Sequence, residues 1–332
     1  MRRMPAAAAA LTVLALALAS AALAGNGGLA PPDAESPNAE GINQTYYFIL
    51  AFTGVIFVLV EGLLLLFVFR FRRGRRSREA EGPQIRGNTR LELIWTLLPV
   101  LILVAIGGFV FYKLPGIQNV PSANAQGGRL DVTVEGHRYY WEYRYPNGVV
   151  AVDRMRAPVG QNVQLTLVAP VDDVIHSWWI PALGGKLDTI PGQTNRTWFR
   201  ARRSGTFVGQ CAEFCGIQHA AMLAAVEVMP REEFEQWLAS EERAQRTGSS
   251  MLGADTWAGA CAKCHGQNAQ GGIGPTLVGN GAFRDREALE AIVRQGQGEM
   301  PPIGQTWDDR QVDALYRYVR REFGSGGGTG GG

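Results

Sequence analysis

Two apolar stretches, 46–69 and 93–112, constrain the fold of this chain more than any other feature of its sequence. Each is long enough to cross a bilayer as a helix, which takes about 20 apolar residues. The segment from Arg70 to Arg90 contains eight arginines and two acidic residues, and such an excess of arginine is typical of a cytoplasmic loop. The sequence therefore predicts a transmembrane helical hairpin over 46–114 with a cytoplasmic loop at 70–92.

The N-terminal residues have the pattern of an export signal. Residues 1–24 begin with two arginines, continue with an Ala/Leu run and end in Ala-Leu-Ala, which predicts a signal peptide cleaved after Ala24. A retained membrane anchor is the alternative. The small, polar residues of 25–45 are expected to form an exported segment. The net charge of +2 gives no reason to expect a nucleic-acid partner.

The four cysteines fall into two short motifs, and the first motif predicts a metal site. Residues 211–222 offer two thiols, an imidazole and a thioether, and His176 offers a second imidazole. This soft donor set favours copper. Two cysteines can bridge a pair of copper ions, with one histidine left for each. A Cys211–Cys215 disulfide and a two-Cys, two-His zinc site are alternatives, but neither has a use for Met222.

The pattern Cys-x-Glu-x-Cys-x-x-x-His-x-x-Met with an upstream His resembles the dinuclear copper A site of cytochrome c oxidase subunit II. The resemblance implies these copper ligands: His176, Cys211, Glu213 through its carbonyl oxygen, Cys215, His219 and Met222. It also implies that the Glu213 side chain can contact a magnesium ion at the interface with subunit I.

The region 128–230 is predicted to form an all-β domain. Short alternating apolar runs separated by turn residues indicate an antiparallel sandwich or barrel, which agrees with the cupredoxin-like domain of the family. The run from Gly136 to Tyr143 resembles the family's aromatic strand, whose first Trp accepts electrons from soluble cytochrome c. Here Tyr139 stands in place of that Trp, and Trp141 is retained. Tyr139 and Trp141 are expected to serve electron entry; a neighbouring residue, or a donor that docks elsewhere, is the alternative. We interpret His137 as structural.

Two acidic residues lie in or beside the apolar stretches. Glu92 belongs to a segment that resembles the family's Glu-x-x-Trp-Thr-x-x-Pro motif, which implies a role at the entrance of a proton path. A first-turn acid that favours the helix dipole is the alternative. Glu61 lies within the first stretch, where an acid is by default a functional candidate; a protonated or paired residue facing a partner helix is the preferred interpretation.

The second cysteine motif, Cys261-Ala262-Lys263-Cys264-His265, is the attachment pattern of heme c. The two thiols bind the vinyl groups, His265 is the proximal iron ligand, and Met300 is expected as the sixth ligand. The predicted order here is a linker helix over 231–250, an all-α class I cytochrome c domain over 251–323 and a disordered tail over 324–332.

The fold class expected is thus multidomain: a two-helix membrane hairpin, an all-β cupredoxin-like domain and a cytochrome c domain. Together they resemble subunit II of caa-type cytochrome c oxidases. The resemblance implies a proton-translocating enzyme complex in which electrons pass from an external donor through heme c and copper A to the oxygen-reducing centre of subunit I. It also implies subunit III and membrane lipid as partners, and a prokaryotic plasma membrane with both domains on the outer face. A copper A nitric oxide reductase and a copper-delivery protein are the alternatives.

Overall fold

The computed structural model describes residues 30–71, 84, 86–121 and 128–324. The predicted signal peptide at 1–24, most of the predicted cytoplasmic loop and the tail after Gly324 lie outside these ranges. The chain divides into two compact units: one comprises 40–118, and the other comprises 1–39 together with 119–332. Each unit is described by itself.

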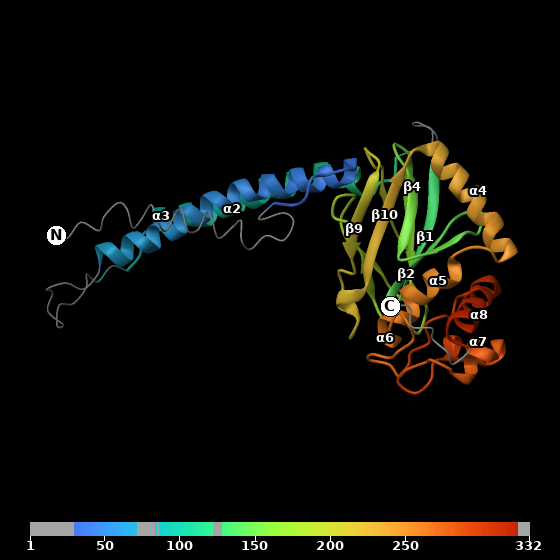
Figure 1. Ribbon diagram of the computed structural model, residues 1–332. Coiled ribbons are helices and arrows are strands. Elements are labelled where there is room, and N and C mark those ends of the chain that lie inside the picture. The colour runs from blue at the N-terminus through green and yellow to red at the C-terminus, as the bar shows by residue number, and fades with distance from the viewer. Residues whose placement is uncertain (1–29, 72–83, 85, 122–127, 325–332) are drawn as a thin grey trace, which may run out of the picture. The chain divides into compact units, whose positions relative to one another are not determined.

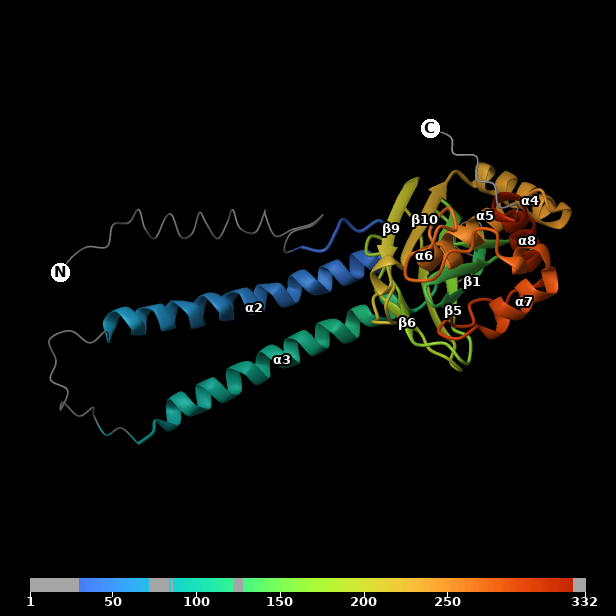
Figure 2. The ribbon, with the colours of Figure 1, turned by 60° about the horizontal axis from the view of Figure 1, so that its bottom comes forward.

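The smaller unit is a pair of long helices, α2 (Pro37–Arg70) and α3 (Thr89–Gln118). The boundary of this unit falls at residue 40, so the first three residues of α2 belong to the larger unit. The two helices run antiparallel (Figure 2), and the rings of Phe48 and Phe109 stack between them with centroids 4.1 Å apart. Both helices are apolar and long enough to cross a membrane, and the apolar window of each has none of its residues buried. A helix that is apolar on all sides and has no protein around it is suited to lipid, since all its backbone hydrogen bonds are internal.

The larger unit is called the outer unit, because its sequence is predicted to lie on the outer face of the membrane. It contains a β domain, green to yellow in Figure 1, with three small sheets. The five-stranded sheet has the order β3-β2-β1-β5-β8, and the other two have the orders β4-β10-β9 and β6-β7. The strands are β1 (Arg129–His137), β2 (Tyr140–Arg144), β3 (Val150–Val152), β4 (Arg154–Pro158), β5 (Asn162–Val168), β6 (His176–Trp178), β7 (Leu187–Thr189), β8 (Asn195–Phe199), β9 (Gly205–Gln210) and β10 (Leu223–Met229). The alternating burial of β5 and β10 shows why these sequences form strands with one face in the core.

The β domain is not wholly antiparallel, in contrast to the expectation from the sequence. β1 pairs with β5 in parallel, and β4 pairs with β10 in parallel. The reason is the route of the chain, which leaves the first sheet after β3, passes through β4 in the second sheet and returns as β5. Between the sheets lies one apolar core that includes Trp141, Trp178 and Leu165, all buried.

Helical segments follow the β domain. These are α4 (Arg231–Thr247), α5 (Leu252–Thr256), the π-helical turn η2 (Trp257–Cys261), α6 (Ala262–His265), the 3-10 turn η3 (Gly281–Arg284), α7 (Arg286–Gln295) and α8 (Asp309–Phe323). A further 3-10 turn, η1 (His219–Ala221), lies in the loop before β10. α4 carries its aromatic residues at helical spacing, so Phe234 and Trp237 meet Tyr145 of the β domain.

The helical domain packs directly on the five-stranded sheet. Its core is built on Trp257, Phe283 and Phe323, and this apolar cluster also contains Tyr140 of β2 and Val152 of β3. The Tyr140 hydroxyl donates to the carbonyl of Ile303 at 2.6 Å and accepts from the indole nitrogen of Trp307 at 2.7 Å. The two domains of the outer unit therefore share a core.

Candidate copper and heme sites

The first candidate site is the loop between β9 and β10, which contains Cys211, Cys215, His219 and Met222. The Sγ atoms of the two cysteines lie 3.9 Å apart, and both thiols are free. The Sγ of Cys215 also lies 3.6 Å from Nδ1 of His219 and 3.9 Å from Sδ of Met222. Four of the predicted ligands therefore converge within one loop.

His176, at the start of β6, comes to this loop from another part of the chain. One of its ring nitrogens and the Sγ atoms of Cys211 and Cys215 lie within 4.8 Å of one another. Its Nε2 lies 3.1 Å from a carboxylate oxygen of Asp173, whereas its buried Nδ1 has no hydrogen-bond partner among the described residues. Ligating histidines usually give one ring nitrogen to a carboxylate and the other to the metal. The orphaned Nδ1 thus fits a metal ion beside the two sulfurs.

Glu213 presents its backbone to the site and its side chain to the surface. The Sγ of Cys211 lies 3.2 Å from the Glu213 carbonyl oxygen, so this oxygen lies beside one of the predicted copper ligands, and its own role as a ligand stays a prediction. The Glu213 carboxylate lies 3.7 Å from Nζ of Lys186, which is also 3.4 Å from a carboxylate oxygen of Asp188. Magnesium takes oxygen ligands in an octahedral arrangement, so a magnesium ion here would need further oxygens from a partner, and this expectation stays a prediction.

The two thiols of the loop have pKa values shifted in opposite directions. The hydrogen bond with Cys215 lowers the pKa of Cys211, and His176 contributes to this shift. The same bond raises the pKa of Cys215, as does burial. The shift at Cys211 favours the thiolate, which is the form that binds metals. With two imidazoles and a thioether beside the sulfurs, the donor set fits copper.

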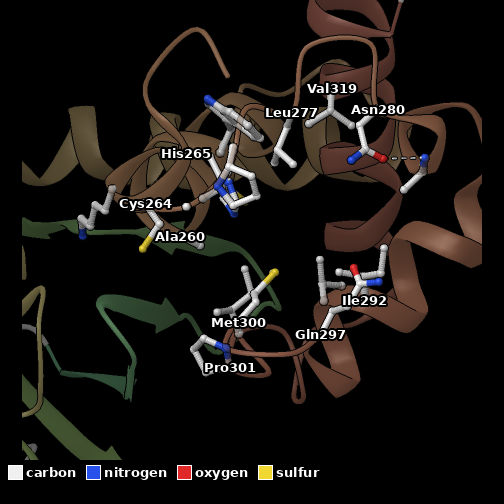
Figure 3. A pocket seen from close by; sticks show the side chains of 18 of the residues that line it. Ala260, Cys264, His265, Leu277, Asn280, Ile292, Gln297, Met300, Pro301 and Val319 are labelled. Atoms are coloured by element: carbon white, nitrogen blue, oxygen red, sulfur yellow. Dashed lines mark hydrogen bonds between the residues drawn. The ribbon is translucent and has the colours of Figure 1, made fainter. Parts of the chain in front are cut away.

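The second candidate site is a cavity of about 520 Å³ in the helical domain. Its lining includes Cys261, Cys264, His265 and Met300. Figure 3 shows His265 and Met300 on opposite sides of this space. The residues present therefore fit a heme with two thiol attachments and two axial ligands, as the sequence predicts.

The orientation of His265 is fixed by the turn at Gly274 and Pro275. Its Nδ1 lies 2.8 Å from the Pro275 carbonyl oxygen, a distance at which the ring N–H donates a hydrogen bond to this oxygen; Nε2 would then be left for the iron. A Cβ atom on Gly274 would lie only 2.7 Å from Cε1 of His265, so the ring packs against a position that needs glycine. On the other side, Met300 is held in a tight turn in which its N–H donates to the Gln297 carbonyl at 3.0 Å.

Tyr139 lies between the two candidate sites. It lines the heme cavity together with Ile217 of the copper loop. A Cβ atom on Gly216, between the predicted ligands Cys215 and His219, would lie 2.5 Å from the Tyr139 hydroxyl oxygen. The tyrosine ring therefore rests on the copper loop and borders the heme cavity at the same time. Nothing in the sequence indicated that Ile217 would line the cavity, because only the packing of the two domains places it there.

Trp141 lies deeper and on the copper side. Its ring is fully buried and meets the ring of His176 edge-on, with centroids 6.1 Å apart. Successive residues of a strand point to opposite faces, so Trp141 faces the β-domain core, whereas Tyr140 faces the helical domain. The electron-entry role of Trp141 stays a prediction.

A further buried polar cluster, Glu135, His137 and Glu142, lies at the contact between the domains. Its ligand atoms are close enough to hold a metal ion. The Arg144 guanidinium already forms ion pairs with both carboxylates, however, so it supplies the positive charge that a metal ion would otherwise provide. Burial lowers the pKa of His137 to about 3, and its ring stacks on Tyr140 with centroids 4.5 Å apart. His137 is thus a neutral packing residue outside the copper loop.

Glu92 lies at the start of α3, where it caps the helix. Its side chain accepts from the backbone N–H of Asn88 at 3.1 Å, while the Asn88 side chain accepts from the N–H of Leu91 at 3.1 Å. This reciprocal pair satisfies donors that the first turn leaves free. The capping contact supports the helix-terminus alternative, and the proton-entry role stays a prediction.

Comparisons with known proteins follow the same division of the chain. The family models described as cytochrome c oxidase subunit II, transmembrane domain and periplasmic domain match residues 24–112 and 148–229. The model described as cytochrome c oxidase, cbb3-type, subunit III matches residues 249–319.

Individual proteins match over most of their length. Cytochrome c oxidase subunit 2 of Alkalihalophilus pseudofirmus is 30% identical, with 87% of this chain and 89% of that protein covered. The subunit 2 of Cereibacter sphaeroides is 34% identical, with 69% and 85% covered. The solved periplasmic domain of subunit II of cytochrome oxidase from Bradyrhizobium japonicum is 32% identical, covers 38% of this chain and 98% of its own, and has a TM-score of 0.34.

Proposed function

Because this chain belongs to the cytochrome c oxidase subunit II family and carries a fused C-terminal cytochrome c domain, we propose that it is the electron-entry subunit of a caa-type oxidase. It is a membrane protein with an outward-facing domain and forms part of a heme-copper oxidase, with subunit I as its partner. In the proposed path an external donor reduces heme c, the electron passes to copper A, and subunit I reduces oxygen.

One observation carries this proposal: the cavity that contains His265 and Met300 is also lined by Tyr139 and by Ile217 of the copper loop. Tyr139 and Ile217 would thus lie between a heme in this cavity and copper ions in the loop. A bound copper pair and heme would each supply one-electron chemistry. The residues of the chain would hold these groups in place.

The rigid surroundings of the copper loop support electron transfer. Cys211 donates its backbone N–H to the Met222 carbonyl at 2.9 Å, and Ala212 donates to the Ser177 carbonyl at 2.9 Å. A Cβ atom on Gly209 would lie 1.8 Å from the Trp179 carbonyl oxygen, so β9 approaches the β6 segment as closely as only glycine permits. Ligands fixed in this way move little when an electron arrives, which favours fast transfer.

The remaining parts of the proposal concern partners and place. We propose that the complex also contains subunit III, that the proteins lie in a prokaryotic plasma membrane, and that both outer domains face away from the cytoplasm. Glu92 would stand where protons enter from the cytoplasmic side, because the arginine-rich segment before it is expected there.

Purification of the intact complex tests the proposal. We expect two copper ions and one covalent heme in this chain, a mixed-valence copper resonance split by two equivalent nuclei, and oxygen consumption driven by a reduced donor. A single metal ion in the copper loop, or zinc, would contradict the copper A assignment. Turnover of nitric oxide in place of oxygen would favour the nitric oxide reductase alternative.

A further inference from the structure

Lys263 lies between the two cysteines that are expected to attach the heme, and its side chain crosses into the β domain. Its Nζ donates to the backbone carbonyl of Tyr139 at 2.8 Å and pairs with the carboxylate of Asp153 at 2.7 Å. The Lys263 side chain is only 14% exposed. The Cys-x-x-Cys-His pattern accepts any residue type at this position, so heme attachment does not explain why a lysine is present.

The backbone of Lys263 makes a second link, to the copper loop. Its carbonyl oxygen accepts from Nε2 of Gln218 at 2.7 Å. Gln218 lies between Ile217, which lines the heme cavity, and His219, a predicted copper ligand. The same residue of the attachment turn therefore contacts Tyr139, in the turn between β1 and β2, and the loop that carries the predicted copper ligands.

Asp153 is a firm anchor for this lysine. It follows β3 with a positive φ of 56°, its side chain accepts from the Trp141 N–H at 2.9 Å, and its own N–H donates to the Trp141 carbonyl at 2.8 Å. Burial raises the pKa of Asp153, and the Lys263 ammonium opposes that rise. A Cβ atom on Gly259 would lie 2.4 Å from Cγ1 of Val152, so the turn η2 approaches the end of β3 very closely.

Other contacts hold the body of the cytochrome domain, away from the heme-attachment turn. Gln311 of α8 donates to Glu142 at 2.9 Å, Arg144 donates to the Thr306 carbonyl at 3.0 Å, and Tyr140 bonds Ile303. Among the described residues, the polar contacts between 261–265 and the β domain are those of Lys263. Loss of the side-chain contacts of Lys263 should therefore shift the heme-attachment turn, while the cytochrome domain stays bound to the β domain.

We propose that Lys263 is a positioning residue that fixes the heme-attachment turn against Tyr139 and the copper loop, and thereby sets the rate of electron transfer from heme c to copper. The inference rests on the proposed function. The cytochrome acts from a docked position, and electron transfer does not require it to leave and rebind. The polar contacts of Lys263 hold Tyr139 and Ile217 in the lining of the heme cavity.

The test compares variants of the assembled oxidase after photoreduction of heme c by a ruthenium complex. The double variant K263M/D153N removes the side-chain contacts of Lys263 with Tyr139 and Asp153 without leaving a lone charge, and it keeps the backbone contact with Gln218. Asp153→Asn alone is a milder second variant. Both should retain the heme and copper content, spectra and midpoint potentials of the wild type. The rate constant for heme c oxidation by copper should fall about tenfold in K263M/D153N, since small displacements of reacting groups cost rate factors of this order or more.

Two further variants separate positioning from a general effect of charge. Lys263→Arg keeps a cation at the same place and should recover most of the rate. Arg310→Met removes an exposed cation that also makes a contact across the domain boundary, where it donates to the Gly148 carbonyl at 3.3 Å. Arg310 does not line the heme cavity, so this variant should leave the rate unchanged. A wild-type rate in both K263M/D153N and Asp153→Asn would overturn the inference. Absence of heme-to-copper transfer in the wild-type complex would instead refute the proposed function.

Discussion

Glu142 makes the stability of the outer unit depend on pH near neutrality. Its side chain is fully buried in β2, opposite Glu135 of β1. Burial raises the pKa of Glu142 from 4.5 to about 7, Glu135 adds to this rise, and the Arg144 guanidinium opposes it. From α8 and the segment before it, Gln311 donates to the carboxylate and Asp308 adds a further negative charge.

The direction of the effect follows from proton binding. Between pH 4.5 and about 7 the folded state holds a proton on Glu142 that the unfolded state has lost. The free energy of unfolding therefore falls as the pH rises through this window. A shift from 4.5 to about 7 corresponds to about 3 kcal/mol at 1.36 kcal/mol per pKa unit. For a region of roughly 200 residues this is about 6–12 °C in Tm.

The perturbation is Glu142→Gln, which keeps an acceptor for Gln311 and removes the titration. Other groups also titrate, because His137, with its pKa lowered to about 3, acts in the opposite direction. The informative quantity is therefore the difference in Tm between variant and wild type, measured by calorimetry on the full chain in detergent at pH 5 and pH 8. At pH 5 the carboxyl of the unfolded state has already lost most of its proton, so about 2.5 kcal/mol of the effect falls between these two pH values. We therefore expect the Tm of the variant to rise by about 5–10 °C relative to that of the wild type between pH 5 and pH 8.

A matched control is Glu227→Gln, which breaks an ion pair with Arg156 at 2.9 Å in which both side chains are about one-third exposed. Its Tm relative to the wild type should be nearly independent of pH, because exposed ion pairs contribute little to stability. An equal difference between Glu142→Gln and the wild type at pH 5 and pH 8 would refute the argument from burial.

Three further predictions concern the proposed sites. Cys215→Ser removes the sulfur that lies nearest both His219 and Met222, and should abolish the mixed-valence copper resonance while the heme c spectrum stays intact. Met300→Leu should lower the midpoint potential of heme c, because a thioether ligand raises it, and should leave copper content unchanged; an unaltered potential would exclude Met300 as the sixth ligand. Glu92→Gln retains an acceptor for the Asn88 N–H, so α3 should stay intact while proton uptake slows; unchanged turnover would leave Glu92 with its capping role alone.

The ligand motifs and the membrane spans were readable from the sequence because they depend on local spacing. Cys211 to Met222 lie in one loop, and Cys261 to His265 in one turn, so chain connectivity alone brings these groups together. An apolar stretch long enough to cross a bilayer has no alternative to a helix in lipid. These features need no knowledge of distant contacts.

The structure alone decided how the distant parts meet. Strand direction followed from a chain that changes sheets after β3, which no alternating pattern records. Three features depend on the cytochrome domain packing onto β2 and β3: the place of Tyr139 between the two candidate sites, the burial of Glu142 and the contact of Lys263 with Asp153. Those contacts join residues more than a hundred positions apart, and only the complete folded chain defines which surfaces face each other.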